Sequence, residues 1–152
     1  MQEDQEKEEI ICNRFEGYQF GDRTEWVSIH DELIHFPGWN PILPTIKLCG
    51  RTIRIRANDA WTRLPRDIKD SMCAHEVGHR ELEHYLKANL LFRVQSLINQ
   101  TPPLDEIAAD RYACKLIPKK KMYRCLNFLM DRSESINIKM EYTYRIRALG
   151  DI

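Results

Sequence analysis

Residues 75 to 79 read His-Glu-Val-Gly-His, and the rest of the chain is organised around this stretch. Two histidines four residues apart lie on the same side of an α-helix, so both imidazoles can reach one metal ion. The glutamate between them projects close by without being a ligand. It can take a proton from an attacking water and deliver it to a leaving amine. The stretch therefore predicts a helix that carries two Zn²⁺ ligands, His75 and His79, and a catalytic base, Glu76.

The flanking residues support this helix, which can begin at Pro65, a residue suited to the first helical turn. Both histidines belong to its apolar stripe, whose spacings of three and four are typical of a helix. The stripe consists of Ile68, Met72, His75, His79, Leu82 and Leu86. Two imidazoles without partners in apolar surroundings are unfavourable, and a bound metal removes that penalty. Gly78 costs about 1 kcal/mol relative to alanine inside a helix, which predicts the close approach of another backbone.

A third metal ligand has to come from elsewhere in the chain. His84 lies five residues past the second histidine, about 140° round the helix, so we do not expect it to bind the same ion. Thr-Pro-Pro at 101 to 103 predicts the start of a further helix over residues 104 to 117. Glu106 begins an otherwise small and apolar face of that helix and is the predicted third ligand. Asp110, one turn on, is predicted to hydrogen-bond a ligand imidazole, although for both residues a solvated acidic helix start is the alternative.

Residues 45 to 56 predict an antiparallel β-hairpin, because apolar residues alternate with polar ones on both sides of a turn at Gly50. An exposed edge at its second strand could hold an extended peptide by main-chain hydrogen bonds. Ile53, Arg54 and Ile55 are the candidate residues for this substrate edge. Residues 10 to 44 show no clean period, and we expect at least one short strand there.

Composition limits the remaining possibilities. With 152 residues, of which 43% are hydrophobic and 30% charged, the chain can bury one real core. We expect an acidic, disordered segment over 1–9 and a single domain over 10–152. Basic and acidic residues balance at 23 each, so no direct nucleic-acid binding and no membrane partner are expected. Five scattered cysteines without a C-x-x-C pair favour reduced thiols and a cytoplasmic location.

Three stretches together resemble the ImmA/IrrE family of zinc metallopeptidases. The first two are Ala-His-Glu-Val-Gly-His at 74 to 79 and the pattern Glu-x-x-Ala-Asp-x-Tyr-Ala at 106 to 113, which is followed by Leu-Ile-Pro. The third is the closing Tyr-Arg-Ile-Arg-Ala-Leu-Gly at 144 to 150. Tyr112 departs from the family, which usually has phenylalanine at this position.

The resemblance implies a zincin-like α+β domain, in which a small antiparallel β-sheet packs against the His-Glu-x-x-His helix and further helices. It implies zinc ligands at His75, His79 and Glu106, with Glu76 as the catalytic base. Family members are typically intracellular proteins of bacteria or mobile elements, and several cleave a repressor of the helix-turn-helix type. Such a repressor of a mobile element or stress regulon is the expected partner. A zinc-stabilised module that binds the repressor without cleaving it is the alternative.

Overall fold

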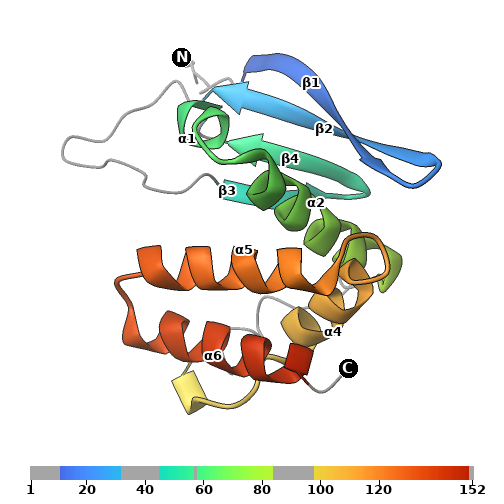
Figure 1. Cartoon of the computed structure of the whole chain (residues 1–152). Coiled ribbons are helices and arrows are strands. Elements are labelled where there is room, and N and C mark those ends of the chain that lie inside the picture. The colour runs from blue at the N-terminus through green and yellow to red at the C-terminus, as the bar shows by residue number, and fades with distance from the viewer. Residues whose placement is uncertain (1–10, 32–44, 57, 84–97, 151–152) are drawn as a thin grey trace, which may run out of the picture. The chain divides into compact units, whose positions relative to one another are not determined.

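The computed structural model describes residues 11–31, 45–56, 58–83 and 98–150 (Figure 1). The chain divides into two compact units, Met1–Leu64 and Pro65–Ile152. The first unit holds a four-stranded sheet and one short helix, and the described part of the second is helical. The predicted α+β class is therefore confirmed. The zincin-like fold and the single domain over 10–152 stay predictions, and the acidic residues 1–9 lie outside the described residues.

The sheet of the first unit is mixed, with the strand order β1-β2-β4-β3. Its elements are β1 (Ile11–Phe20), β2 (Arg23–Asp31), β3 (Thr45–Cys49), β4 (Thr52–Arg56) and the helix α1 (Asn58–Thr62). The predicted hairpin is present as the antiparallel pair β3–β4, with Gly50 at a positive φ of 62° in its turn. The prediction of at least one strand before it is also confirmed, by the long antiparallel pair β1–β2.

The prediction of an antiparallel sheet is wrong, because β2 pairs with β4 in parallel. A parallel pair needs a long connection rather than a tight turn, and the chain between the two strands contains the whole of β3. The same pairing makes β4 an interior strand. Ile53, Arg54 and Ile55 have partners on both β2 and β3, so their main-chain groups offer no free edge to a peptide. The edges of this sheet belong to β1 and β3.

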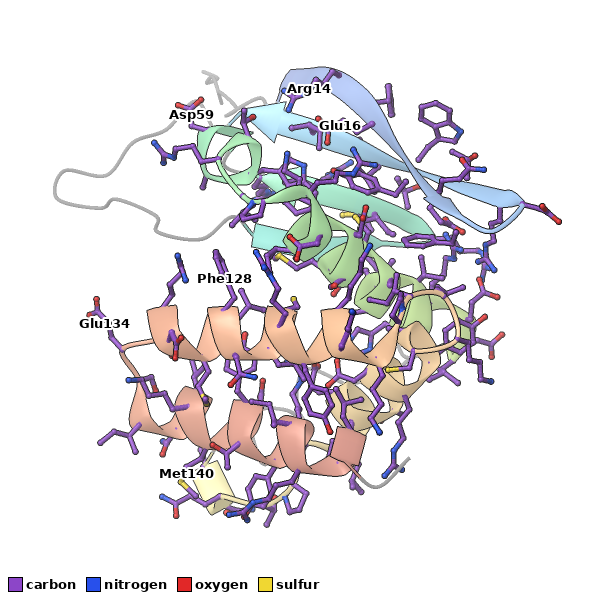
Figure 2. The ribbon with its side chains drawn as sticks, viewed as in Figure 1. Arg14, Glu16, Asp59, Phe128, Glu134 and Met140 are labelled. Carbon is purple, nitrogen blue, oxygen red and sulfur yellow. The ribbon has the colours of Figure 1, made fainter. Side chains whose placement is uncertain are left out.

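A buried aromatic cluster anchors α1 within the first unit. The indole of Trp61 is fully buried and meets the ring of Tyr18 edge to face, with centroids 6.1 Å apart. Both rings donate hydrogen bonds to the carboxylate of Glu16, at 3.0 Å from Trp61 and 2.7 Å from Tyr18. Arg14, next to Glu16 on β1 in Figure 2, donates to the other carboxylate oxygen at 3.0 Å. Burial alone would raise the pKa of Glu16, but these hydrogen bonds outweigh it and lower the pKa to about 2.

We expect Glu16→Gln to destabilise the protein at neutral pH but not at acidic pH. A carboxyl group whose pKa is lower in the folded state stabilises that state above its unfolded pKa of 4.5, and this contribution is lost as the pH falls towards 2. The free energy of unfolding should fall by about 1–2 kcal/mol at pH 7 and by much less near pH 2.5. Urea denaturation at both pH values measures it, with Asp22→Asn on the exposed β1–β2 turn as the control. Equal losses at both pH values would contradict the assignment.

Four helices of the second unit are described in full. They are α2 (Arg66–Glu81), α4 (Leu104–Ala113), α5 (Lys119–Arg132) and α6 (Ile136–Gly150). The predicted helix starts hold, because α2 follows Pro65 and α4 follows Pro103 directly. The core side of α5 consists of Met122, Cys125, Leu126 and Leu129.

Other expectations have mixed outcomes. Leu82, predicted to face inward, lies just past the end of α2 and is 41% exposed. His84 and Leu86, the last residue of the predicted stripe, lie outside the described residues. The cysteines with described side chains are free thiols: Cys49, Cys73, Cys114 and Cys125. Over the described ranges, none of the helices combines the length and the apolar character needed to cross a membrane.

Candidate metal centre

Three side chains from two helices of the second unit converge on one point. His75 and His79 lie one turn apart on α2, with their Nε2 atoms 3.0 Å from each other. Glu106, in the first turn of α4, places its Oε1 3.0 Å from Nε2 of His75 and 3.4 Å from Nε2 of His79. All three are largely buried, with side chains 10% to 14% exposed. The three residues predicted as ligands therefore form a group that could bind a metal ion.

The spacing of these donors fits a small tetrahedral ion. Zinc binds imidazole nitrogen and carboxylate oxygen at about 2.0–2.2 Å. At tetrahedral angles, two such ligand atoms are then separated by ~3.3 Å. The observed edges of 3.0, 3.0 and 3.4 Å lie close to that value. The donors thus form one face of a tetrahedron, which leaves its fourth corner for a water or a substrate atom.

Gly78 allows α4 to approach α2 closely enough to bring Glu106 into the group. A Cβ atom at this position would lie 2.7 Å from the carbonyl oxygen of Ala109 and 3.0 Å from its Cα. The first distance is shorter than real Cβ contacts and the second is tighter than nearly all of them, and both neighbours are backbone atoms that cannot rotate away. The close backbone approach predicted for this glycine is confirmed.

We expect Gly78→Ala to destabilise the protein, although alanine is the better helix former by about 1 kcal/mol. The added methyl group forces α2 and α4 apart, and overpacking of this kind costs about 1–3 kcal/mol. The same displacement moves Glu106 away from the histidines, so metal affinity should fall as well. Thermal unfolding and a metal titration test this. Gly150→Ala is the control, because among the described residues its Cβ would come near the end of one side chain, the Tyr123 hydroxyl at 3.3 Å, and near no backbone atom of another element. Unchanged affinity in Gly78→Ala would contradict the reasoning.

Two buried charged residues in series orient His75 through its Nδ1 atom, on the side of the imidazole away from the metal position. Asp110 of α4 accepts a hydrogen bond from Nδ1 of His75 at 2.7 Å, which is the arrangement expected from the sequence. Arg145 of α6 donates to both oxygens of Asp110, at 2.8 and 2.9 Å. With its proton on Nδ1, the imidazole presents the lone pair of Nε2 to the metal position.

Arg145 and its second carboxylate partner were missed by the sequence reasoning, which assigned no chemistry to the last helix. Glu141 lies one turn before Arg145, with its Oε1 3.6 Å from the guanidinium. Both side chains are nearly fully buried and share a stripe of α6 with Leu149. The available signal was the presence of two opposite charges, four residues apart, in positions that a core-facing helix normally fills with apolar residues.

The groups around His75 favour a proton on this imidazole. Burial and the charge of Arg145 would lower the pKa of His75, but Asp110 and Glu106 outweigh them and raise it to about 10. Burial and the charge on His75 lower the pKa of His79. Burial would raise the pKa of Glu106, but hydrogen bonds from both histidines lower it well below its usual value. A metal must therefore displace the proton on His75, so its affinity falls as the pH falls.

The formal charges of the cluster also favour a cation. With neutral imidazoles, Arg145 supplies one positive charge and Glu106, Asp110 and Glu141 supply three negative ones. The net formal charge of these four side chains is thus −2. Buried charges are costly unless they are paired, and a divalent ion would balance this excess. One proton on His75 balances only half of it.

We expect zinc affinity to fall in a graded manner when each carboxylate is changed to its amide. Glu106→Gln removes a ligand and should have the largest effect. Asp110→Asn, which keeps an acceptor for His75 but loses the charge, should weaken zinc binding about 10–100-fold. Glu141→Gln, a further contact away through Arg145, should have the smallest effect. Competition with a chromophoric chelator at fixed pH measures all three, and equal losses would argue against the assigned roles.

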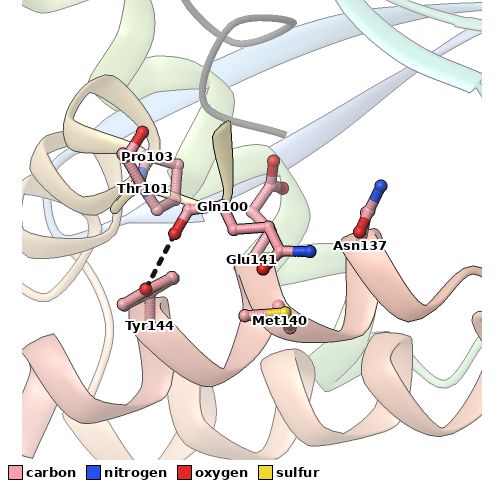
Figure 3. A pocket seen from close by; sticks show the side chains of 7 residues that line it. All are labelled: Gln100, Thr101, Pro103, Asn137, Met140, Glu141 and Tyr144. Carbon is pink, nitrogen blue, oxygen red and sulfur yellow. Dashed lines mark hydrogen bonds between the residues drawn. The ribbon is translucent and has the colours of Figure 1, made fainter. Parts of the chain in front are cut away.

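The remaining candidates occupy different positions. The carboxylate of Glu76 is buried beside the cluster, with Oε2 3.9 Å from Nε2 of His75. The substrate-edge candidates lie on β4, in the first unit. A pocket in the second unit, shown in Figure 3, has Glu141 in its wall, and two other lining residues are joined by a 3.0 Å hydrogen bond from Tyr144 to the carbonyl of Gln100. It measures about 10 Å³, room for about one water molecule, so it is too small for a substrate.

Comparison of the chain with protein-family models, with curated proteins and with solved structures gives no match.

Proposed function

We propose that the chain is a zinc-dependent endopeptidase, a hydrolase that cleaves peptide bonds in a protein substrate. The observation that carries this proposal is the convergence of His75, His79 and Glu106 at tetrahedral spacing, with the carboxylate of Glu76 beside them. Two imidazoles and one carboxylate, with a fourth position left open, are the ligand set of several zinc peptidases. Structural zinc sites usually have four protein ligands, so the small number of donors favours a catalytic site.

Each side chain has a role that follows from its position. His75, His79 and Glu106 would hold the ion, and Asp110 with Arg145 keeps His75 in the tautomer and orientation that binding needs. A zinc ion held there would supply Lewis acidity towards a water molecule and a substrate carbonyl. Glu76 accepts the proton of the attacking water and transfers it to the amine that leaves.

The resemblance to the ImmA/IrrE family supports a choice of substrate, a helix-turn-helix repressor of a mobile element or stress regulon. Each of the three stretches behind that resemblance contributes to the same buried cluster. The first supplies His75, the second Glu106 and Asp110, and the third Arg145. Stretches far apart in the chain that meet at one site support a shared role for them.

A non-proteolytic regulatory module is the second candidate. The cluster ties α2, α4 and α6 together through the hydrogen bonds of His75, Asp110 and Arg145. A metal bound there would stabilise the helical unit whether or not a peptide is cleaved. Such a module would bind the repressor and leave it intact. The two candidates differ in what they require of Glu76, which only the peptidase needs.

We expect Glu76→Gln to abolish cleavage and to leave zinc binding unchanged. Loss of a general base typically lowers the rate about 10²–10⁴-fold, whereas the ligands remain in place. The assay combines the purified protein with a helix-turn-helix repressor from the same organism, with cleavage followed by mass spectrometry and zinc content by elemental analysis. Glu81→Gln, an exposed glutamate on the same helix, is the matched control and should cleave normally.

Two outcomes would contradict the peptidase. If Glu76→Gln cleaves the repressor as fast as the parent, Glu76 is not the base. If neither protein cleaves it but both bind it with equal affinity, the regulatory module is the correct function. Loss of zinc in Glu76→Gln would instead show that this residue is a ligand.

A further inference from the structure

One face of the sheet in the first unit combines exposed aromatic rings with positive charge. Strand alternation and the cross-strand register place five such residues on it, and we call this the basic face. They are Phe15, Trp26, Lys47, Arg54 and Arg56. His30 lies on the same face but is buried. Among strand residues with described side chains, the carboxylates are Glu16 and Glu25. Both lie on the opposite face, where Arg14 and Arg23 pair with them.

The two aromatic rings form a platform. Phe15 is 65% exposed and Trp26 is 62% exposed, although both are large and apolar. Phe15 pairs with Ser28 and Trp26 with Gly17, so the two residues are diagonal neighbours on adjacent strands, with their backbones about 7–8 Å apart. A Cβ at Gly17 would lie 3.1 Å from the indole, so the ring rests against the β1 backbone at this glycine. The indole is thereby held in place while most of its surface stays open.

The cations of the basic face occupy neighbouring positions on adjacent strands. Arg54 on β4 lies directly opposite Lys47 on β3, and like charges in that position destabilise a sheet. Arg56 follows on the same face of the strand, about 6.8 Å along it. Burial and the charges of Arg54 and Arg56 lower the pKa of His30, as expected if both guanidinium groups face it. Nε of Arg54 is buried without a hydrogen-bond partner in the part of the chain that the structure describes.

A partner that relieves this repulsion must be anionic, and a partner that covers the rings must offer flat apolar surfaces. Single-stranded nucleic acid has both properties, because every nucleotide carries a phosphate and an unpaired base. A duplex exposes phosphates but keeps its bases stacked on one another. An acidic peptide supplies charge without the stacking surfaces.

We infer that the basic face binds single-stranded nucleic acid, with bases stacked on Trp26 and Phe15 and phosphates beside Lys47, Arg54 and Arg56. The net charge of the whole chain is balanced, but it does not describe how charge is distributed over the surface. Among the described side chains of the sheet, the cations Lys47, Arg54 and Arg56 lie on the basic face and the carboxylates lie on the opposite face. The binding does not depend on the metal centre, which belongs to the other unit.

The experiment measures fluorescence anisotropy of labelled single-stranded DNA and RNA of about 16 nucleotides, and of the matching DNA duplex, titrated with the full-length protein. Titrations at ~50 mM and ~150 mM salt give the salt dependence. We expect both single strands to bind at least about tenfold more tightly than the duplex. The DNA and RNA titrations show which of the two is preferred.

Variants of the face then locate the binding. Trp26→Thr, which suits a strand but removes the ring, should weaken binding about tenfold, and Trp26→Phe should keep most of it. Arg54→Gln should reduce the slope of log affinity against log salt by about 0.7, the contribution of one phosphate contact. Lys120→Gln, in an exposed lysine run on α5, is the control for charge and should bind like the parent. Glu76→Gln should also bind normally, so a failed peptidase assay leaves this result unaffected.

Several outcomes would overturn the inference. Absence of binding to any single strand at low salt would do so directly. If Trp26→Thr binds as tightly as the parent, or if Lys120→Gln weakens binding as much as Arg54→Gln does, the binding is non-specific charge attraction and the inference is wrong. If the parent protein self-associates by light scattering and Trp26→Thr is monomeric, the face is a protein interface instead.

Discussion

The close approach of α4 to α2 at Gly78 is the constraint on which the second unit depends. Only a residue without a side chain lets the backbone at Ala109 come this near. Because Glu106 and Asp110 lie on either side of Ala109 on α4, the same approach delivers a ligand to one nitrogen of His75 and a carboxylate to the other. The penalty of a glycine inside a helix is therefore linked directly to the assembly of the cluster.

Much of the candidate site could be predicted because its signals are local. Helical spacing is enough to put His75 and His79 on one side, and the proline before α4 fixes where Glu106 falls relative to its helix. Arg145 could not be found this way. Its role depends on where α6 packs, because the opposite charges of Glu141 and Arg145 are equally compatible with an exposed ion pair on the helix surface. The signal becomes clear only when burial is known.

The sheet was harder to predict, because its register and strand order are not local properties. The polar Glu16 accepts hydrogen bonds from the buried Tyr18 and Trp61 whereas the apolar Phe15 is exposed, so the sequence of β1 lacks the simple alternation by which a strand is recognised. Nothing in the sequence of Thr52–Arg56 indicates that this strand pairs with β2 as well as with β3. The strand predicted to form an exposed edge therefore lies inside the sheet. The register also decides which charged residues share a face of the sheet. The overall charge balance therefore could not predict a face that has cations and no carboxylate among its described side chains.

The buried cluster and the basic face carry excess charge of opposite sign, which bears on what each site could bind. In the cluster, acidic groups exceed Arg145 and are held ready for a cation by hydrogen bonds between 2.7 and 3.0 Å. On the sheet, Lys47 and Arg54 repel each other across neighbouring strands. Buried charges and like charges that face each other both carry an electrostatic cost to the fold. A cation at one site and a polyanion at the other would each convert this penalty into binding free energy.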